Sequence, residues 1–132
     1  MKKAIMVAIV LVVAVVAAYA LLASRAPKVS ADCVLITGTS ATITYTQSEQ
    51  FTPACVKVNS GTKITYVNQS GKTLQIGADP HPIHTGNREV SDGQFTLDVA
   101  PGKSAQTTVV KKGAFGYHNH LHFESTGTIV VQ

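Results

Sequence analysis

Short runs in which apolar and polar residues alternate follow one another along most of the chain beyond residue 31. Residues 55–58 and 63–67 are two such runs, and both carry β-branched or aromatic side chains at every second position. The sequence Asn-Ser-Gly at 59–61 lies between them and favours a turn. A period of two bounded by turn residues predicts β-strands.

The remaining runs extend this pattern over most of the chain after residue 31. None of them shows a sustained period of 3.6 residues, which argues against helices. Seven or eight short strands in about 100 residues are typical of an all-β sandwich. The predicted strands are residues 42–46, 55–58, 63–67, 73–76, 94–99, 104–110, 114–120 and 127–131.

Residues 4–23 differ from the rest of the chain because they are uncharged and almost entirely apolar. As a helix this stretch would be about 30 Å long, the thickness of the apolar part of a bilayer. The apolar part of a signal peptide is usually shorter, about 7–15 residues, so we predict an uncleaved N-terminal transmembrane helix. A cleaved signal peptide is the alternative, with Val-Ser-Ala at 29–31 as its small-residue cleavage site.

The net charge of +4 arises entirely from four basic residues around the apolar stretch: Lys2, Lys3, Arg25 and Lys28. Residues 32–132 hold seven basic and seven acidic residues, so this part is neutral overall. A neutral domain gives no support to nucleic-acid binding. We therefore divide the chain into an anchor or signal peptide with its linker at 1–31 and one β domain at 32–132.

Both cysteines of the chain, Cys33 and Cys55, lie in the β domain. An even number of cysteines in an exported domain favours a disulfide, which would contribute roughly 3 kcal/mol by closing its loop. Two buried thiols or a two-cysteine metal site are the alternatives, but no Cys-x-x-Cys motif is present. The cysteines and histidines together favour a domain on the extracytoplasmic side of the cell membrane, or an exported soluble form if the segment is cleaved.

All five histidines fall in two short clusters. His81 and His84 belong to an Asp-Pro-His-Pro-Ile-His sequence, and His118, His120 and His122 follow Tyr117 at alternate positions. Because strand side chains alternate between faces, the second cluster can project to one side, and a loop with His81 and His84 could close over it. Surface histidines without a metal are the simpler alternative.

Neutral imidazoles suit Cu(II), Zn(II) and Ni(II), whereas Ca and Mg prefer oxygen ligands. We therefore predict a metal site formed by His81, His84, His118 and His120, with His122 as a further candidate. Copper is the expected metal, and zinc is the alternative. Carboxylates are few in this region, only Asp79 and Glu124, which makes a general acid–base hydrolase a poor fit.

Several segments of the β domain match a known family. They are Phe-Thr-Pro at 51–53, Val-Lys-Val at 56–58, residues 61–68, Pro-Gly-Lys-Ser at 101–104, Gly-Ala-Phe-Gly-Tyr at 113–117 and Gly-Thr-Ile-Val-Val at 127–131. With these segments the chain resembles the cupredoxins over most of residues 32–132. The resemblance implies a Greek-key β-sandwich and a role in copper chemistry.

The ligands of a blue-copper site are mostly missing from this resemblance. In a blue-copper cupredoxin the strand after the Gly-x-x-x-Tyr stretch carries Cys, His and Met in that order. Asn119 stands at the Cys position, His122 at the His position and Ser125 at the Met position, while the upstream His position falls on Leu74. Because a blue site needs the thiolate, we do not expect type 1 copper.

The second histidine cluster resembles instead the Gly-x-x-x-Tyr-His-x-His pattern of multicopper oxidase domains. There a His-x-His pair helps to hold copper ions between two domains, and His118 with His120 matches that pair. A similar Asp-Pro-His-Pro-x-His loop, followed by Gly-Tyr-His-x-His, is found in small exported cupredoxin-like proteins of bacteria. One domain lacks the second half of an oxidase, so oxidase activity does not carry over.

The sequence thus predicts a membrane-anchored copper-binding protein that handles copper or transfers electrons, more plausibly a binding protein than an enzyme. Its partners would be the metal ion, the membrane through the N-terminal helix, and a redox or copper-transfer protein. A mononuclear copper enzyme with oxidase- or reductase-like activity is one alternative. A module of a larger oxidase-like assembly and a metal-free structural sandwich are the others.

Overall fold

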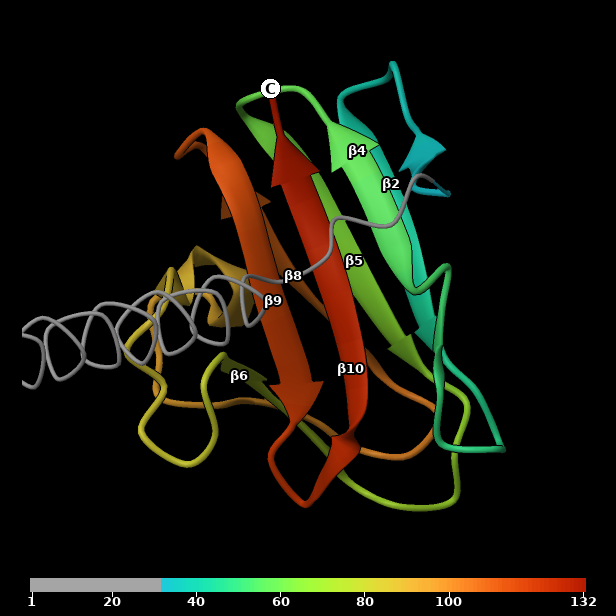
Figure 1. Cartoon of the computed structure of the whole chain (residues 1–132). Coiled ribbons are helices and arrows are strands. Elements are labelled where there is room, and N and C mark those ends of the chain that lie inside the picture. Colours follow the sequence, from blue (N-terminus) through green and yellow to red (C-terminus); the bar gives the residue numbers. More distant parts are fainter. Residues whose placement is uncertain (1–31) are drawn as a thin grey trace, which may run out of the picture.

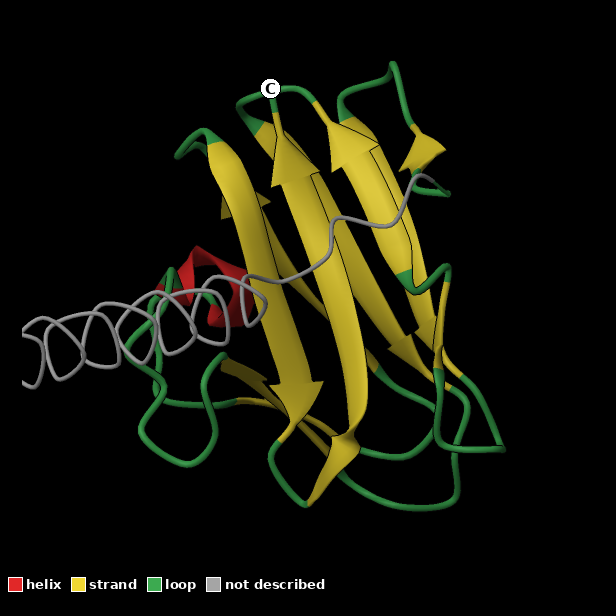
Figure 2. Cartoon of the chain, viewed as in Figure 1, coloured by secondary structure: helices red, strands yellow, loops and turns green. Residues whose placement is uncertain are grey.

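The computed structural model describes residues 32–132, which form two β-sheets packed face to face (Figure 1). The predicted anchor and linker at 1–31 lie outside the described residues. In residues 32–132 no helix has the length and apolar character needed to cross a membrane. Figure 2 shows that strands and loops make up nearly all of this part.

Six strands form the first sheet and four form the second. In spatial order the first sheet holds β1 (Val34–Leu35), β4 (Cys55–Val58), β10 (His122–Val131), β9 (Gly113–Asn119), β6 (Leu74–Ala78) and β7 (Leu97–Val99). The second sheet holds β3 (Phe51–Thr52), β2 (Ser40–Tyr45), β5 (Thr62–Asn68) and β8 (Ser104–Val109). A 3₁₀ helix, η1 (Arg88–Ser91), lies between β6 and β7 in sequence.

The core lies between the sheets because alternate residues of each strand point inward. Ile64 and Tyr66 of β5 are fully buried, as are Ile76 of β6 and Ile129 of β10. Strands β2 and β5 run parallel, and so do β4 and β10, so both sheets contain pairs that a simple hairpin cannot make. The predicted all-β sandwich is confirmed.

A disulfide joins Cys33 to Cys55 of β4, as predicted. The disulfide attaches the segment before β1 to β4. Strand β1 also pairs with β4, in parallel orientation. The alternatives of two free thiols or a two-cysteine metal site are thereby excluded.

Two neighbouring strands of the first sheet, β6 and β9, position the histidines. Strands β6 and β9 are antiparallel, with Gly77 paired to His118 and Ala78 to Tyr117. The histidine-containing loop starts directly after β6, and the second cluster lies where β9 turns into β10. The two clusters, distant in sequence, are therefore neighbours in the fold.

Candidate metal centre

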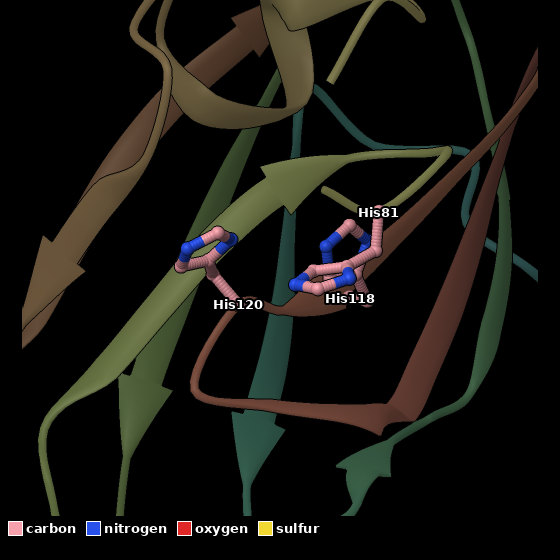
Figure 3. Close-up of side chains that lie close together, drawn as sticks. All are labelled: His81, His118 and His120. Carbon is pink, nitrogen blue, oxygen red and sulfur yellow. The ribbon is translucent and has the colours of Figure 1, made fainter. Parts of the chain in front are cut away.

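Three imidazoles from the two clusters converge at the end of strand β9. His81, His118 and His120 each offer one nitrogen, and these nitrogens all lie within 4.8 Å of one another. Figure 3 shows that His118 and His120 extend from the end of β9, whereas His81 extends from the loop after β6. These three histidines form a group that could bind a metal ion.

His84 adds a fourth imidazole to this group. Its Nε2 lies 3.1 Å from Nε2 of His118 and 3.1 Å from Nδ1 of His120. Metal–nitrogen bonds of about 2.0 Å would allow one ion to reach both members of such a pair. We use the name histidine cluster for His81, His84, His118 and His120.

Hydrogen bonds at the far side of two rings determine which nitrogen faces the cluster. Nδ1 of His84 lies 2.8 Å from the backbone oxygen of Phe95, and Nδ1 of His118 lies 2.6 Å from Oδ1 of Asp79. Both oxygens only accept hydrogen bonds, so each Nδ1 carries a proton and donates it. In the neutral rings, both Nε2 atoms then present lone pairs to each other across 3.1 Å. Only a proton or a metal ion between them turns this contact into an attraction.

The loop that carries His81 and His84 is held against the sheet by backbone hydrogen bonds. The amide of Asp79 donates to the oxygen of Gly116, and the amide of Gly86 donates to the oxygen of Asp79. His84 itself has a φ of 49°, in the left-handed region that non-glycine residues seldom adopt. Its amide donates to Pro80, and Nε of Arg88 donates to its carbonyl oxygen. A strained residue held from both sides is typical of functional sites.

Room for the His84 ring depends on Gly77, the residue paired with His118 across β6 and β9. A Cβ atom at position 77 would overlap the His84 ring atoms, which are fully buried. The ring therefore occupies the space that a side chain on β6 would take. Glycine at this position was not among the residues that the sequence marked as functional, because its role depends on a loop contact.

We expect Gly77→Ala to displace His84 and weaken metal binding at least tenfold while the sandwich still folds. The added methyl group meets the imidazole, and even small misplacements of a ligand cost affinity. Titration of the variant with Cu(II), beside its thermal unfolding without metal, measures both effects. Gly71→Ala is the matched control, since nothing lies within 4 Å of a Cβ atom there and its φ is not in the left-handed region. Unchanged affinity in Gly77→Ala would contradict this account of the cluster.

Two aromatic rings pack against members of the histidine cluster. The ring of Phe95 stacks on His84 with centroids 4.2 Å apart, and Phe123 stacks on His81 at 5.1 Å. His84 and His118 are buried, whereas His81 is exposed, so the cluster reaches from the edge of the core to the surface.

Burial lowers the pKa of two members of the cluster. Removal from water is the main cause for His118, and the neighbouring imidazoles add to it, while Asp79 opposes the shift. Removal from water also lowers the pKa of His120, again with a contribution from the nearby histidines. Both rings therefore remain neutral, and able to bind a metal, at a more acidic pH than a free imidazole.

His122, the fifth histidine of the prediction, is not in the group of converging nitrogens. Strand β9 ends at Asn119, and the chain turns, so His122 begins β10 and pairs with Asn119. The turn breaks the alternation on which the prediction of one shared face rested. Nδ1 of His122 instead lies 3.1 Å from a carboxylate oxygen of Glu49 and 3.0 Å from the hydroxyl of Ser125.

Three of the four positions that correspond to blue-copper ligands, Asn119, His122 and Ser125, share a hydrogen-bonded network. The side-chain amide of Asn119 donates to the hydroxyl of Tyr45, which also lies 3.3 Å from the hydroxyl of Ser125. Leu74 is fully buried in the apolar core. Amide, hydroxyl and alkyl groups replace the thiolate, thioether and upstream imidazole there, so the residues do not fit a type 1 copper ion.

Comparison with solved structures shows the same fold. A purple cupredoxin from Nitrosopumilus maritimus is 15% identical, with a TM-score of 0.57, over 70% of this chain and 99% of that protein. The oxidized form of plastocyanin from Dryopteris crassirhizoma is 15% identical, with a TM-score of 0.54, over 70% and 100%. A copper-containing nitrite reductase from Thermus scotoductus is 18% identical, with a TM-score of 0.54, over 70% and 22%.

The family of the chain follows from a comparison of its sequence with family models. A search among curated proteins gave no match. The model described as copper binding proteins of the plastocyanin/azurin family matches residues 36–132, about three-quarters of the chain and nearly all of the sandwich. The chain therefore belongs to the plastocyanin/azurin family of copper binding proteins.

Proposed function

We propose that this protein binds one copper ion through His81, His84, His118 and His120, and that it handles copper rather than catalysing a reaction. The observation that carries the proposal is the approach of Nε2 of His84 to Nε2 of His118 at 3.1 Å. Each ring donates its other N–H to an oxygen, so both facing nitrogens are acceptors. A metal ion satisfies such a pair without a change of protonation.

The number of imidazoles favours binding over catalysis. A catalytic metal usually keeps an open position beside three protein ligands. Four histidines would fill most of the coordination sphere of copper, and Phe95 and Phe123 stack on two of them. Copper sequestration or delivery fits this arrangement better than an oxidase- or reductase-like reaction does.

The place of the protein in the cell forms part of the same proposal. The apolar stretch at 4–23 supports an N-terminal transmembrane anchor, and a disulfide is typical of an oxidising compartment. The copper site would then face the extracytoplasmic side, where a redox or copper-transfer protein could exchange the ion with it.

Metal titration of the full-length protein, purified in detergent, tests this function. We expect one Cu(II) per chain at micromolar metal, with a weakly coloured, type-2-like EPR spectrum and nitrogen hyperfine coupling from several imidazoles. Zn(II) should compete for the same site, because it accepts the same ligands. A protein that takes up neither Cu(II) nor Cu(I) under these conditions would refute the proposal.

A further inference from the structure

Asp79 is the acidic residue whose carboxylate contacts a ring of the histidine cluster on the side away from the converging nitrogens. Oδ1 of Asp79 lies 2.6 Å from Nδ1 of His118, on the opposite side of that ring from the converging nitrogens. The carboxylate is 45% exposed, whereas the His118 side chain is only 1% exposed. Asp79 therefore contacts the metal site through His118, with its own charge near the surface.

The backbone on both sides of Asp79 keeps the carboxylate in place. Its amide and its carbonyl oxygen are both hydrogen-bonded, to Gly116 and Gly86 respectively. A Cβ atom at Gly116 would overlap the Asp79 carboxylate, so glycine on β9 leaves the space that this side chain occupies. The packing of the fold thus fixes the contact between Asp79 and His118. Asp79 is not a freely moving surface side chain.

His84, the other buried member of the cluster, has a different kind of partner. Its Nδ1 donates to the neutral carbonyl of Phe95 at 2.8 Å, whereas Nδ1 of His118 donates to an anion. Both partners select the same tautomer and direct Nε2 inward. The carboxylate, as an anion, makes its imidazole the stronger electron donor of the two.

The negative charge has a further consequence for the ion that the site prefers. The attraction between a fixed carboxylate and an ion is proportional to the charge of the ion, so a dication gains about twice what a monocation gains. Four neutral imidazoles add no net charge of their own. Arg88, whose Nε donates to the backbone oxygen of His84, is the other charged side chain here, and its positive charge acts in the opposite direction. Asp79 is therefore the group whose charge favours Cu(II) over Cu(I).

We propose that Asp79 is a positioning residue that orients His118 and makes the site favour divalent over monovalent copper. This inference rests on the proposed function and goes beyond it, because it assigns the oxidation state that the site prefers.

Substitution of Asp79 in the full-length protein tests the inference. Asp79→Asn keeps an oxygen acceptor for His118 but removes the charge, and Asp79→Ala removes both. We expect Cu(II) affinity to fall 10–100-fold in both variants and Cu(I) affinity to fall much less. The reduction potential of the bound copper should then rise by about 59 mV for each tenfold change in the ratio of the two affinities.

Two controls separate the charge effect from a structural one. Zn(II), which has no redox chemistry, should lose affinity in parallel with Cu(II). Asp98→Asn removes a carboxylate whose contacts are Gln75 and Thr96, and it should leave both copper affinities unchanged. Equal losses of Cu(I) and Cu(II) affinity in Asp79→Asn, with an unchanged potential, would overturn the inference while the binding function stands. Absence of copper binding in the unsubstituted protein would instead refute the proposed function itself.

Discussion

Replacing His118 and His120 together with alanine should abolish stoichiometric copper binding, with a loss of affinity well above 100-fold. Loss of a residue that only hydrogen-bonds to a metal ligand costs 10–100-fold, and this variant removes two of the proposed ligands themselves. His118 is the larger contributor, because its Nε2 faces His84 and its Nδ1 is held by Asp79. Isothermal titration with Cu(II) and the EPR spectrum measure the loss directly.

His122→Ala is the matched control for this double variant. It also removes an imidazole from the β9–β10 hairpin, but its contacts are Glu49 and Ser125 rather than the histidine cluster. We expect its copper affinity to stay within about threefold of the unsubstituted protein, a change of less than 1 kcal/mol. If His122→Ala loses copper and the double variant keeps it, the metal lies beside His122 and the assigned site is wrong.

His118 is buried, so the double variant also needs a check on folding. Truncating a buried side chain leaves a cavity that destabilises the core. Thermal unfolding of the metal-free proteins shows whether the sandwich persists. His120→Ala alone involves a less buried side chain and should weaken copper binding with little loss of stability.

Most of the sandwich could be predicted from the sequence because its strands alternate between core and solvent. The predicted strand at residues 55–58 coincides with β4, and the one at residues 63–67 differs from β5 by one residue at each end. Strands β1 and β3 are only two residues long, too short for a period of two to be recognised. Strand β10 begins at His122 because it pairs with β9, a long-range contact that local pattern does not encode.

The candidate site was predictable to a similar degree and for similar reasons. Two clusters of imidazoles are visible in the sequence, and the pairing of Gly77 with His118 explains why they meet. The roles of Asp79 and of the Phe95 carbonyl depend on contacts between segments 11 to 39 residues apart. The side of the hairpin on which His122 lies depends on the residue at which β9 ends. Alternation along the sequence alone does not predict that residue.

Acidification should both release the metal and destabilise the metal-free protein. The ligands must be neutral to bind, and the pKa values of His118 and His120 are lowered by burial. Protonation of His118 and His120 should therefore begin to weaken Cu(II) binding only at a more acidic pH than protonation of a free imidazole would. Below that pH each ligand that takes up a proton makes affinity fall by up to about tenfold per pH unit.

The stability of the metal-free protein should follow the same two residues. Their pKa values are lower in the folded state than the ordinary value of 6.5, so the unfolded chain takes up protons first as the pH falls. Stability is therefore constant well above pH 6.5, decreases as the pH falls through the folded-state values, and levels off below them. Metal at 100 times its dissociation constant adds about 2.7 kcal/mol near neutral pH, and this increment disappears with the metal.

Unfolding by denaturant, measured from pH 8 to 4.5 with and without Cu(II), separates the two effects. The difference between the two curves reports metal release, and the metal-free curve reports the buried imidazoles. His118→Ala and His120→Ala should flatten the metal-free curve, because they remove the groups with lowered pKa values. Unchanged copper affinity from pH 7 to pH 4.5 would contradict this prediction, because protons should compete with the ion for every imidazole of the site.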